Sequence, residues 1–171
     1  MTVVRRTRKG GFTLVEILIV VIILGILAAI VIPQFTSASQ DARKNSLTSQ
    51  LQTLRSQIEL YKLQHLDQLP SELIGASPNW SQFTMKTNDQ GTTGTTSAHV
   101  FGPYLQADPK NPLNGASTVS TVGTDYTTFP AAYTGTAGFV INTVNGKIWG
   151  TSAKKGFIYD EGTPAATSND N

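Results

Sequence analysis

The side chains that could carry out chemistry are few in this 171-residue sequence, and their spacing matches no catalytic site. The chain has no cysteine, which excludes a disulfide, a thiolate metal site and a cysteine nucleophile. His65 and His99 are the two histidines, and no nucleophile elbow, zinc-protease helix or phosphate-binding loop is present. Asp160 and Glu161 are adjacent, so their carboxylates point in different directions rather than at one reacting bond. We therefore expect no enzymatic activity.

The charge of the chain is divided unevenly and argues against a nucleic-acid partner. Four of the 13 basic residues lie before Gly11, where there is no acidic residue. From Phe12 onward nine basic residues stand against 11 acidic ones, a net charge of −2. A surface that neutralises phosphates needs an excess of Lys and Arg, which this part of the chain lacks. We therefore predict that the protein does not bind nucleic acid.

The element that must position everything else is an apolar run from Phe12 to Ile32, interrupted by Thr13 and Glu16. At 1.5 Å per residue, a helix of about 20 residues spans the bilayer core. Basic residues immediately before such a segment hold that end in the cytoplasm. The sequence predicts a single-pass membrane helix with a cytoplasmic N-terminus and a C-terminal body on the other side of the membrane. Before any assembly, the expected partner of this helix is therefore membrane lipid.

Glu16 is the residue that a simple anchor does not explain. A carboxylate inside a membrane helix costs roughly 2.5 to 3.5 kcal/mol on insertion scales, so it normally has a partner or a function. Being near one end of the helix, it could also reach the interface. If the leader were cut just before Phe12, the new α-amino group would lie one turn from Glu16 and could neutralise it, within one chain or between neighbours.

The stretch Lys9–Glu16 (KGGFTLVE), followed by the apolar run and Pro33, resembles the N-terminal signal of type IV pilins and type II secretion pseudopilins. The resemblance implies that prepilin peptidase cuts after Gly11 and that the exposed residue, Phe12, is N-methylated. It also implies that Glu16 registers an incoming subunit against the N-terminal amine of a neighbour, so that Phe12 and Glu16 are the assembly residues.

Pro33 is where the resemblance places a bend in the N-terminal helix. Proline removes a backbone donor and clashes with the preceding turn, and Gly25 adds a second weak point, so we predict a helix kink at these residues. The alternative is that the membrane helix ends at Pro33. The expected organisation is a cleaved leader (1–11), a membrane and filament-core helix (12–33), an amphipathic periplasmic half (34–69) and a loop-rich globular β region (70–171).

The amphipathic half has one apolar stripe. Leucine, isoleucine and aromatic side chains recur at spacings of four and three: Leu47, Leu51, Leu54, Ile58, Tyr61 and His65. The stripe predicts a helix packed on a sheet, with His65 as a packed or capping residue rather than a metal ligand, because no second ligand lies at a usable spacing. A heptad coiled coil is the weaker alternative.

The remainder of the chain reads as turns and short strands. Residues 138–150 place two β-prone runs around Asn145-Gly146, which predicts a hairpin with a two-residue turn. Residues 155–159 could add a strand, whereas 87–97 and 114–124 are rich in Gly, Thr and Ser and predict loops or irregular edge structure. The expected fold is α+β and pilin-like: a long N-terminal helix packed on a small C-terminal antiparallel sheet of three or four strands.

Two further segments, 99–105 (HVFGPYL) and 108–112 (DPKNP), resemble elements of the major pseudopilin of type II secretion. The match is partial, because Lys110 and Asn111 replace the usual tryptophan and glycine. In that family a calcium ion often clamps the C-terminal loop. The candidates here, Asp108, Asp125 and the Asp160-Glu161 pair, are scattered without the spacing of an oxygen cage, so we expect no metal and no cofactor.

The resemblance implies a structural subunit of a type II secretion pseudopilus, which polymerises through its N-terminal helix and drives protein export. Its partners would be other copies of the chain, prepilin peptidase, an inner-membrane assembly platform and minor pilin-like subunits. The expected location is the bacterial inner membrane, with the C-terminal domain in the periplasm and a filament after assembly. The alternatives are a type IV pilus subunit for adhesion, motility or DNA uptake, and a membrane-anchored periplasmic binding module.

Overall fold

The computed structural model describes residues 11–126, 133, 135–152, 158–159 and 161. The predicted leader, apart from Gly11, and most of the predicted strand at 155–159 therefore lie outside the described residues. The chain divides into two compact units, Met1–Ser39 and Gln40–Asn171. Each unit is described below by itself.

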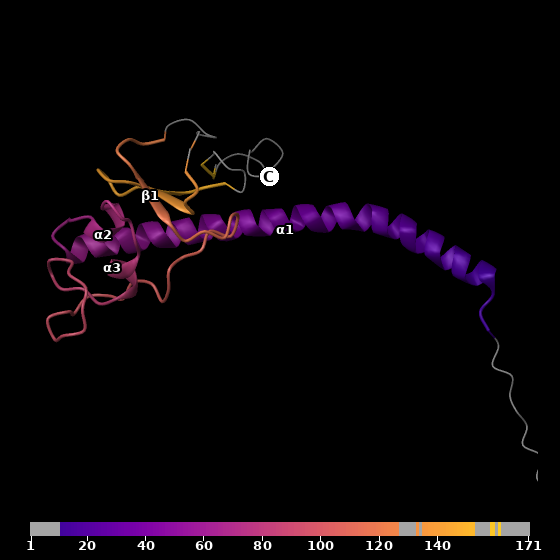
Figure 1. The fold of residues 1–171 in the computed structure, drawn as a ribbon, viewed down its shortest axis with the longest axis horizontal. Coiled ribbons are helices and arrows are strands. Elements are labelled where there is room, and N and C mark those ends of the chain that lie inside the picture. Colours follow the sequence, from indigo (N-terminus) through magenta and orange to yellow (C-terminus); the bar gives the residue numbers. More distant parts are fainter. Residues whose placement is uncertain (1–10, 127–132, 134, 153–157, 160, 162–171) are drawn as a thin grey trace, which may run out of the picture. The chain divides into compact units, whose positions relative to one another are not determined.

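Helix α1 (Leu14–Gln64) has 51 residues and runs through both units (Figure 1). It continues without interruption across Pro33, which excludes the alternative that the helix ends there. Proline has no N–H to donate, so one carbonyl in the preceding turn loses its helical partner. Just after the proline, the hydroxyls of Thr36 and Ser37 donate to the carbonyls of Ile32 and Pro33, at 3.2 Å each. A kink at Pro33 and Gly25 stays a prediction.

In the second unit, the part of α1 from Gln40 onward supplies one wall of the core. The predicted stripe is buried throughout, with exposed fractions of 2% or less from Leu47 to His65. Figure 1 shows the sheet and the short helices gathered around this part of the helix. The periodicity of the sequence therefore predicted correctly which face of the helix is buried. Helix α1 ends at Gln64, and the next turn leaves the helix through positive φ angles at Leu66 and Asp67.

The sheet has three strands in the order β1-β2-β3: β1 (Val119–Val122), β2 (Phe139–Asn142) and β3 (Ile148–Gly150). The α+β, pilin-like fold is confirmed, but the sheet is mixed rather than wholly antiparallel. Strand β1 pairs parallel with β2, with Val119 opposite Phe139, whereas β2 and β3 are antiparallel. The reason lies in the connections: β2 and β3 are joined by a short loop, while 16 residues separate Val122 from Phe139, enough for a parallel crossover.

The hairpin predicted at 138–150 is present, but its turn is longer than two residues. Residues 143–147 join the strands, and Gly146 has a φ of +75° whereas Asn145 has no positive φ. The prediction of irregular structure over 114–124 was wrong for β1, which is an edge strand of the sheet. Ile158 forms an isolated antiparallel bridge with Thr151, so this part of the predicted last strand lies beside β3.

Two short helices complete the core, α2 (Ser71–Ile74) and α3 (Ser81–Thr84). Each buries one large apolar side chain, Leu73 and Phe83, against the α1 stripe and the inner face of the sheet. Trp80 stands edge-on to both Phe83 and Phe139, with ring centroids 6.1 and 5.6 Å apart, and its indole N–H donates to the carbonyl of Ser117 at 2.6 Å. The core is thus aliphatic along α1 and aromatic at the end near α3.

Candidate functional site

The first turn of α1 contains a hydrogen-bonded pair that sequence reasoning missed. The backbone N–H of Thr13 donates to Oε2 of Glu16 at 2.8 Å, and the Thr13 hydroxyl donates to the same oxygen at 2.9 Å. In return, the N–H of Glu16 donates to Oγ1 of Thr13 at 3.2 Å. This reciprocal arrangement is a capping box, in which Thr13 is the N-cap and Glu16 the third helical residue. The signal in the sequence was Thr-x-x-Glu immediately before an apolar run.

The capping box gives Glu16 a function within its own chain. Its carboxylate satisfies a backbone donor that would otherwise have no partner at the helix start, and a negative charge there is favoured by the helix dipole. The carboxylate is therefore not an uncompensated charge in an apolar segment. Any second partner, such as an α-amino group, would have to share or replace these hydrogen bonds.

The residues just before the helix are open to other molecules. Gly11 has no neighbouring atom within 4 Å of the place where a Cβ would be, and the Phe12 side chain is 84% exposed. Residues 11–13 carry no regular secondary structure, so α1 begins only after the predicted cleavage point. The structure places Gly11, Phe12 and Glu16 within one short segment, and their roles in processing and assembly stay predictions.

The first half of α1 exposes a long apolar surface. Its large hydrophobic side chains from Leu14 to Phe35 are each at least 40% exposed. The helix is long and apolar enough to cross a membrane, and its apolar stretch lies near the N-terminus with none of it buried inside the described structure. Such a surface needs lipid or protein around it. The helix therefore fits membrane anchoring.

The segment His99–Leu105 is a structural element of the second unit. Tyr104 and Leu105 donate their N–H groups to the carbonyl of Phe83 at 2.8 and 2.9 Å, and the Tyr104 hydroxyl donates to Oε1 of Gln64 at 2.6 Å. Gly102, at a φ of +71°, precedes a cis bond to Pro103. The segment thus fastens α3 to the end of α1.

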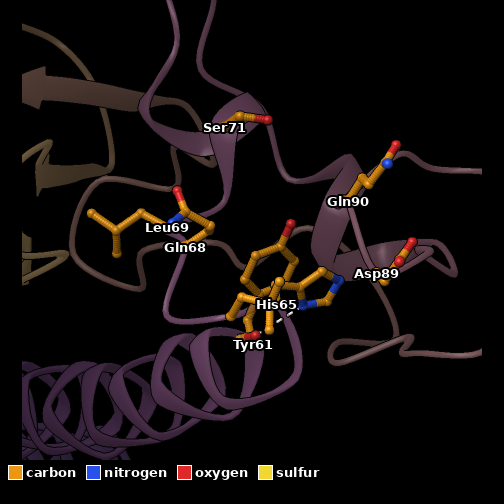
Figure 2. A pocket seen from close by; sticks show the side chains of 8 residues that line it. Tyr61, His65, Gln68, Leu69, Ser71, Asp89 and Gln90 are labelled. Carbon is orange, nitrogen blue, oxygen red and sulfur yellow. Dashed lines mark hydrogen bonds between the residues drawn. The ribbon is translucent and has the colours of Figure 1, made fainter.

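His65 lies just after the end of α1, and both nitrogens of its ring have hydrogen-bond partners. Its ring stacks on Tyr61 with centroids 3.8 Å apart, Nδ1 is 2.8 Å from the Tyr61 carbonyl, and Nε2 is 3.0 Å from Oγ1 of Thr87. Both residues line a cavity of about 300 Å³, together with Asp89 and Gln90. Figure 2 shows the two rings close together, with Gln90 and Asp89 to one side of them. Burial, with the neighbouring Tyr104, raises the pKa of Tyr61 to about 12, so this phenol stays neutral. Because both ring nitrogens of His65 have partners inside the chain, it is a packed residue, as predicted.

Asn111, one of the residues that depart from the pseudopilin pattern, is a buried connector. Its Nδ2 donates to the carbonyls of Gly138 and Thr151 at 2.8 Å each, and its Oδ1 accepts the N–H of Leu113 at 2.8 Å. A buried amide with all these partners joins the loop after Pro109 to the ends of β2 and β3. The departure from the pattern therefore has a structural use.

The carboxylates considered for calcium are dispersed. Asp108 is exposed, Glu161 accepts two hydrogen bonds from the guanidinium of Arg55 at 2.5 and 2.9 Å, and Asp125 is bound by Lys147 and two asparagines. Asp160 lies outside the described residues. Within the described parts of the chain, no three His, Cys, Asp or Glu side chains gather where a metal ion could be held.

Comparison with known proteins points to one family. Residues 6–32 match the family described as the prokaryotic N-terminal methylation motif. The type II secretion system core protein G of Dickeya chrysanthemi is 43% identical over 56 residues, which is 33% of this chain and 37% of that protein. The protein of the same name from Pectobacterium carotovorum subsp. carotovorum is 38% identical over 109 residues, 63% of this chain and 56% of that protein.

A pilus protein matches over a larger share of its own length. The type IV narrow pilus major component of Thermus thermophilus is 30% identical over 99 residues, which is 55% of this chain and 85% of that protein. No solved structure matches. The chain spans less than two thirds of the length of the two core proteins G that it matches. The methylation motif, the capped apolar helix and the coverage of the pilus component together show that the chain belongs to the family of type IV pilins and type II secretion pseudopilins.

Proposed function

We propose that this chain is the major structural subunit of a type II secretion pseudopilus. The observation that carries the proposal is the 109-residue match to a type II secretion system core protein G, which is too long to be confined to α1. The segment His99–Leu105, which resembles the major pseudopilin, supports the same assignment because its backbone and Tyr104 fasten α3 to the end of α1. The protein acts by assembling and carries out no catalysis.

Processing is the first step of the proposed function. Prepilin peptidase cuts after Gly11, which lies before the helix and has open space around it, and Phe12 becomes the methylated N-terminus. The basic leader keeps this end in the cytoplasm until then, and the second unit lies in the periplasm. The new α-amino group then competes with Thr13 for the carboxylate of Glu16.

Assembly follows from the apolar surface of α1. In the inner membrane lipid covers this surface, and in a filament other copies of the same helix cover it, so the transfer costs little hydrophobic free energy in either direction. Head-to-tail contacts that do not close produce an open filament. An inner-membrane platform extracts the subunits, and minor pilin-like subunits accompany them.

The second candidate is a type IV pilus subunit, which the match to the Thermus pilus component favours. Deleting the gene in the native host separates the two. If the chain is a pseudopilus subunit, the deletion strain should accumulate secreted proteins in the periplasm while its surface pili persist. Expression of the chain in that strain should then restore secretion. Loss of pili, twitching or DNA uptake with normal secretion would instead assign the chain to a pilus.

Processing is tested by the intact mass and N-terminal sequence of the protein recovered from native membranes. A chain that begins at Phe12 with one added methyl group agrees with the proposal. A chain that begins at Met1 would contradict it and leave a membrane-anchored binding module as the better description. Gly11→Ala is the matched variant and should leave an uncut form that retains the basic leader.

A further inference from the structure

A network of polar side chains around Asp125 holds the loop between β2 and β3. Oδ1 of Asp125 accepts hydrogen bonds from Nδ2 of Asn142 at 2.5 Å and from Nδ2 of Asn145 at 2.9 Å. Its other oxygen, Oδ2, pairs with the ammonium group of Lys147. All three donors belong to the β2–β3 hairpin, whereas Asp125 follows β1. The network therefore ties the segment after β1 to the hairpin.

The orientation of the two asparagine amides is fixed by the backbone. Oδ1 of Asn142 accepts the N–H of Val144 at 2.7 Å, and Oδ1 of Asn145 accepts the N–H of Lys147 at 3.0 Å. A backbone N–H can only donate, so each amide must turn its oxygen to the loop and its NH₂ group to Asp125. Asn142 is 2% exposed and has little freedom to turn otherwise.

This donor set is the opposite of a calcium site. Calcium takes six to eight oxygen ligands at about 2.3–2.6 Å. Around Asp125 the amide oxygens are already used by backbone N–H groups, the amide nitrogens point at the carboxylate, and an ammonium group lies at Oδ2. The calcium that the family resemblance implies therefore does not fit these residues.

We propose that Lys147 serves as the structural cation at Asp125. Its ammonium group, together with the amides of Asn142 and Asn145, neutralises and orients Asp125 as a bound divalent ion would, so the unit folds and stays folded without calcium. The inference does not depend on whether the filament is a pseudopilus or a pilus.

The geometry distinguishes this contact from an ordinary surface salt bridge. Isolated ion pairs on the surface contribute little to the stability of the folded state, because both side chains are mobile and solvated. Two amide donors, Asn142 and Asn145, hold Asp125 independently of Lys147, and the Asp125 side chain is only 27% exposed, so the carboxylate is already oriented when Lys147 binds it. The Lys147 side chain is 62% exposed, so salt weakens its contribution without abolishing that of the amides.

The experiment is thermal unfolding of the full chain in detergent micelles, followed by circular dichroism, with EGTA and with millimolar CaCl₂. We expect the same Tm in both solutions and no saturable heat of calcium binding in calorimetry. Lys147→Met keeps the aliphatic stem and should lower Tm by about 2 °C or more. Lys110→Met, an exposed lysine for which the described residues show no ion pair, is the matched control and should leave Tm unchanged.

A double-mutant cycle tests whether Lys147 acts through Asp125. Asp125→Asn should also lower Tm, and the double variant should be no less stable than the less stable single variant, because the two substitutions remove the same contact. Additive losses would overturn the proposal, as would a saturable rise in the Tm of the wild-type protein with calcium. A Lys147→Met variant as stable as the Lys110→Met control would overturn it as well.

Discussion

At the scale of single residues, Glu16 combines two requirements that a substitution can separate. It completes the capping box with Thr13, and in the proposed assembly it also binds the amine of Phe12. Glutamine serves in capping boxes as glutamate does, but it carries no charge. Glu16→Gln therefore leaves the helix start intact while removing the partner of the amine.

We expect Glu16→Gln to insert into membranes normally and to be cut after Gly11, while the yield of filaments falls about tenfold or more. A loss of about 1.4 kcal/mol of pairing energy corresponds to tenfold in an equilibrium constant. Sheared filaments quantified by immunoblot measure the yield. Thr13→Val is the control, because it keeps the charge of Glu16 but removes the capping hydroxyl. This variant should retain most of the filament yield. A normal yield from the Gln variant would restrict Glu16 to capping.

Asp125 makes the stability of the second unit depend on pH. The ammonium of Lys147 and the amides of Asn145 and Asn142 hold the pKa of this carboxyl below its ordinary value of 3.8. The folded state therefore binds the proton more weakly than the unfolded state. Asp125 therefore stabilises the folded state above about pH 4, the pKa of its carboxyl in the unfolded chain. This stabilisation is lost as the pH falls through the lower pKa of the same carboxyl in the folded protein.

Unfolding of the full chain in micelles between pH 7 and pH 2 measures this dependence. The wild-type Tm should fall more steeply below pH 4 than the Tm of Asp125→Asn, so the two curves converge in acid. Parallel curves over the whole range would show that Asp125 is not linked to folding.

At the scale of elements, the core is organised by the α1 stripe. Leu51 is completely buried in a cluster with the inner face of the sheet. Leu51→Ala should destabilise the second unit by about 2–5 kcal/mol, because it leaves a cavity as well as losing apolar burial. Urea unfolding of the full chain in micelles measures the change.

The exposed neighbour Gln52 provides the control for this prediction. Gln52→Ala should change stability by less than about 0.5 kcal/mol. Both variants should reach the membrane fraction equally, since neither alters the apolar run. An unchanged free energy of unfolding for Leu51→Ala would mean that the stripe does not form the core.

Elements whose pattern is formed by residues near one another in the sequence could be predicted, and elements that depend on distant residues could not. The α1 stripe repeats over five turns and the β2–β3 hairpin is local, so both were predictable from residue spacing. The length of the turn was not, because residues 143–147 join the strands in place of the two-residue turn that Asn-Gly predicts. Strand β1 is a short Thr- and Ser-containing segment whose pairing with β2 depends on residues far along the chain. Its parallel direction carried no local signal.

The candidate site shows the same division. Glu16 was identified as exceptional from its charge alone, but its bonds to Thr13 were overlooked although Thr-x-x-Glu is a local pattern. The partners of Asn111 and Asp125, by contrast, are brought together only by the sheet, and spacing could not have found them. From the sequence, Lys110 and Asn111 were only departures from a family pattern. The fold shows that Asn111 joins its loop to the ends of β2 and β3 by hydrogen bonds.

At the scale of the whole molecule, the division at Ser39 and Gln40 separates an apolar surface from a core. The core around the α1 stripe lies entirely after Gln40, and so does a second buried cluster made by Tyr133, Ala137, Val140, Trp149 and Ile158. The exposed apolar run lies entirely before Gln40. The first unit therefore requires lipid or other copies, and the second carries its own hydrophobic core. A chain that starts at Gln40 should consequently be independent of the membrane.

We expect this shortened chain to be soluble without detergent and to unfold cooperatively on heating, as judged by circular dichroism. Asp41 would then lie in the first turn of the shortened helix, where its charge is favoured by the helix dipole. The full chain, as a control, should sediment with membranes and be released only by detergent. A shortened chain that aggregates, or that lacks a cooperative transition, would show that the second unit needs the membrane half of α1 in order to fold.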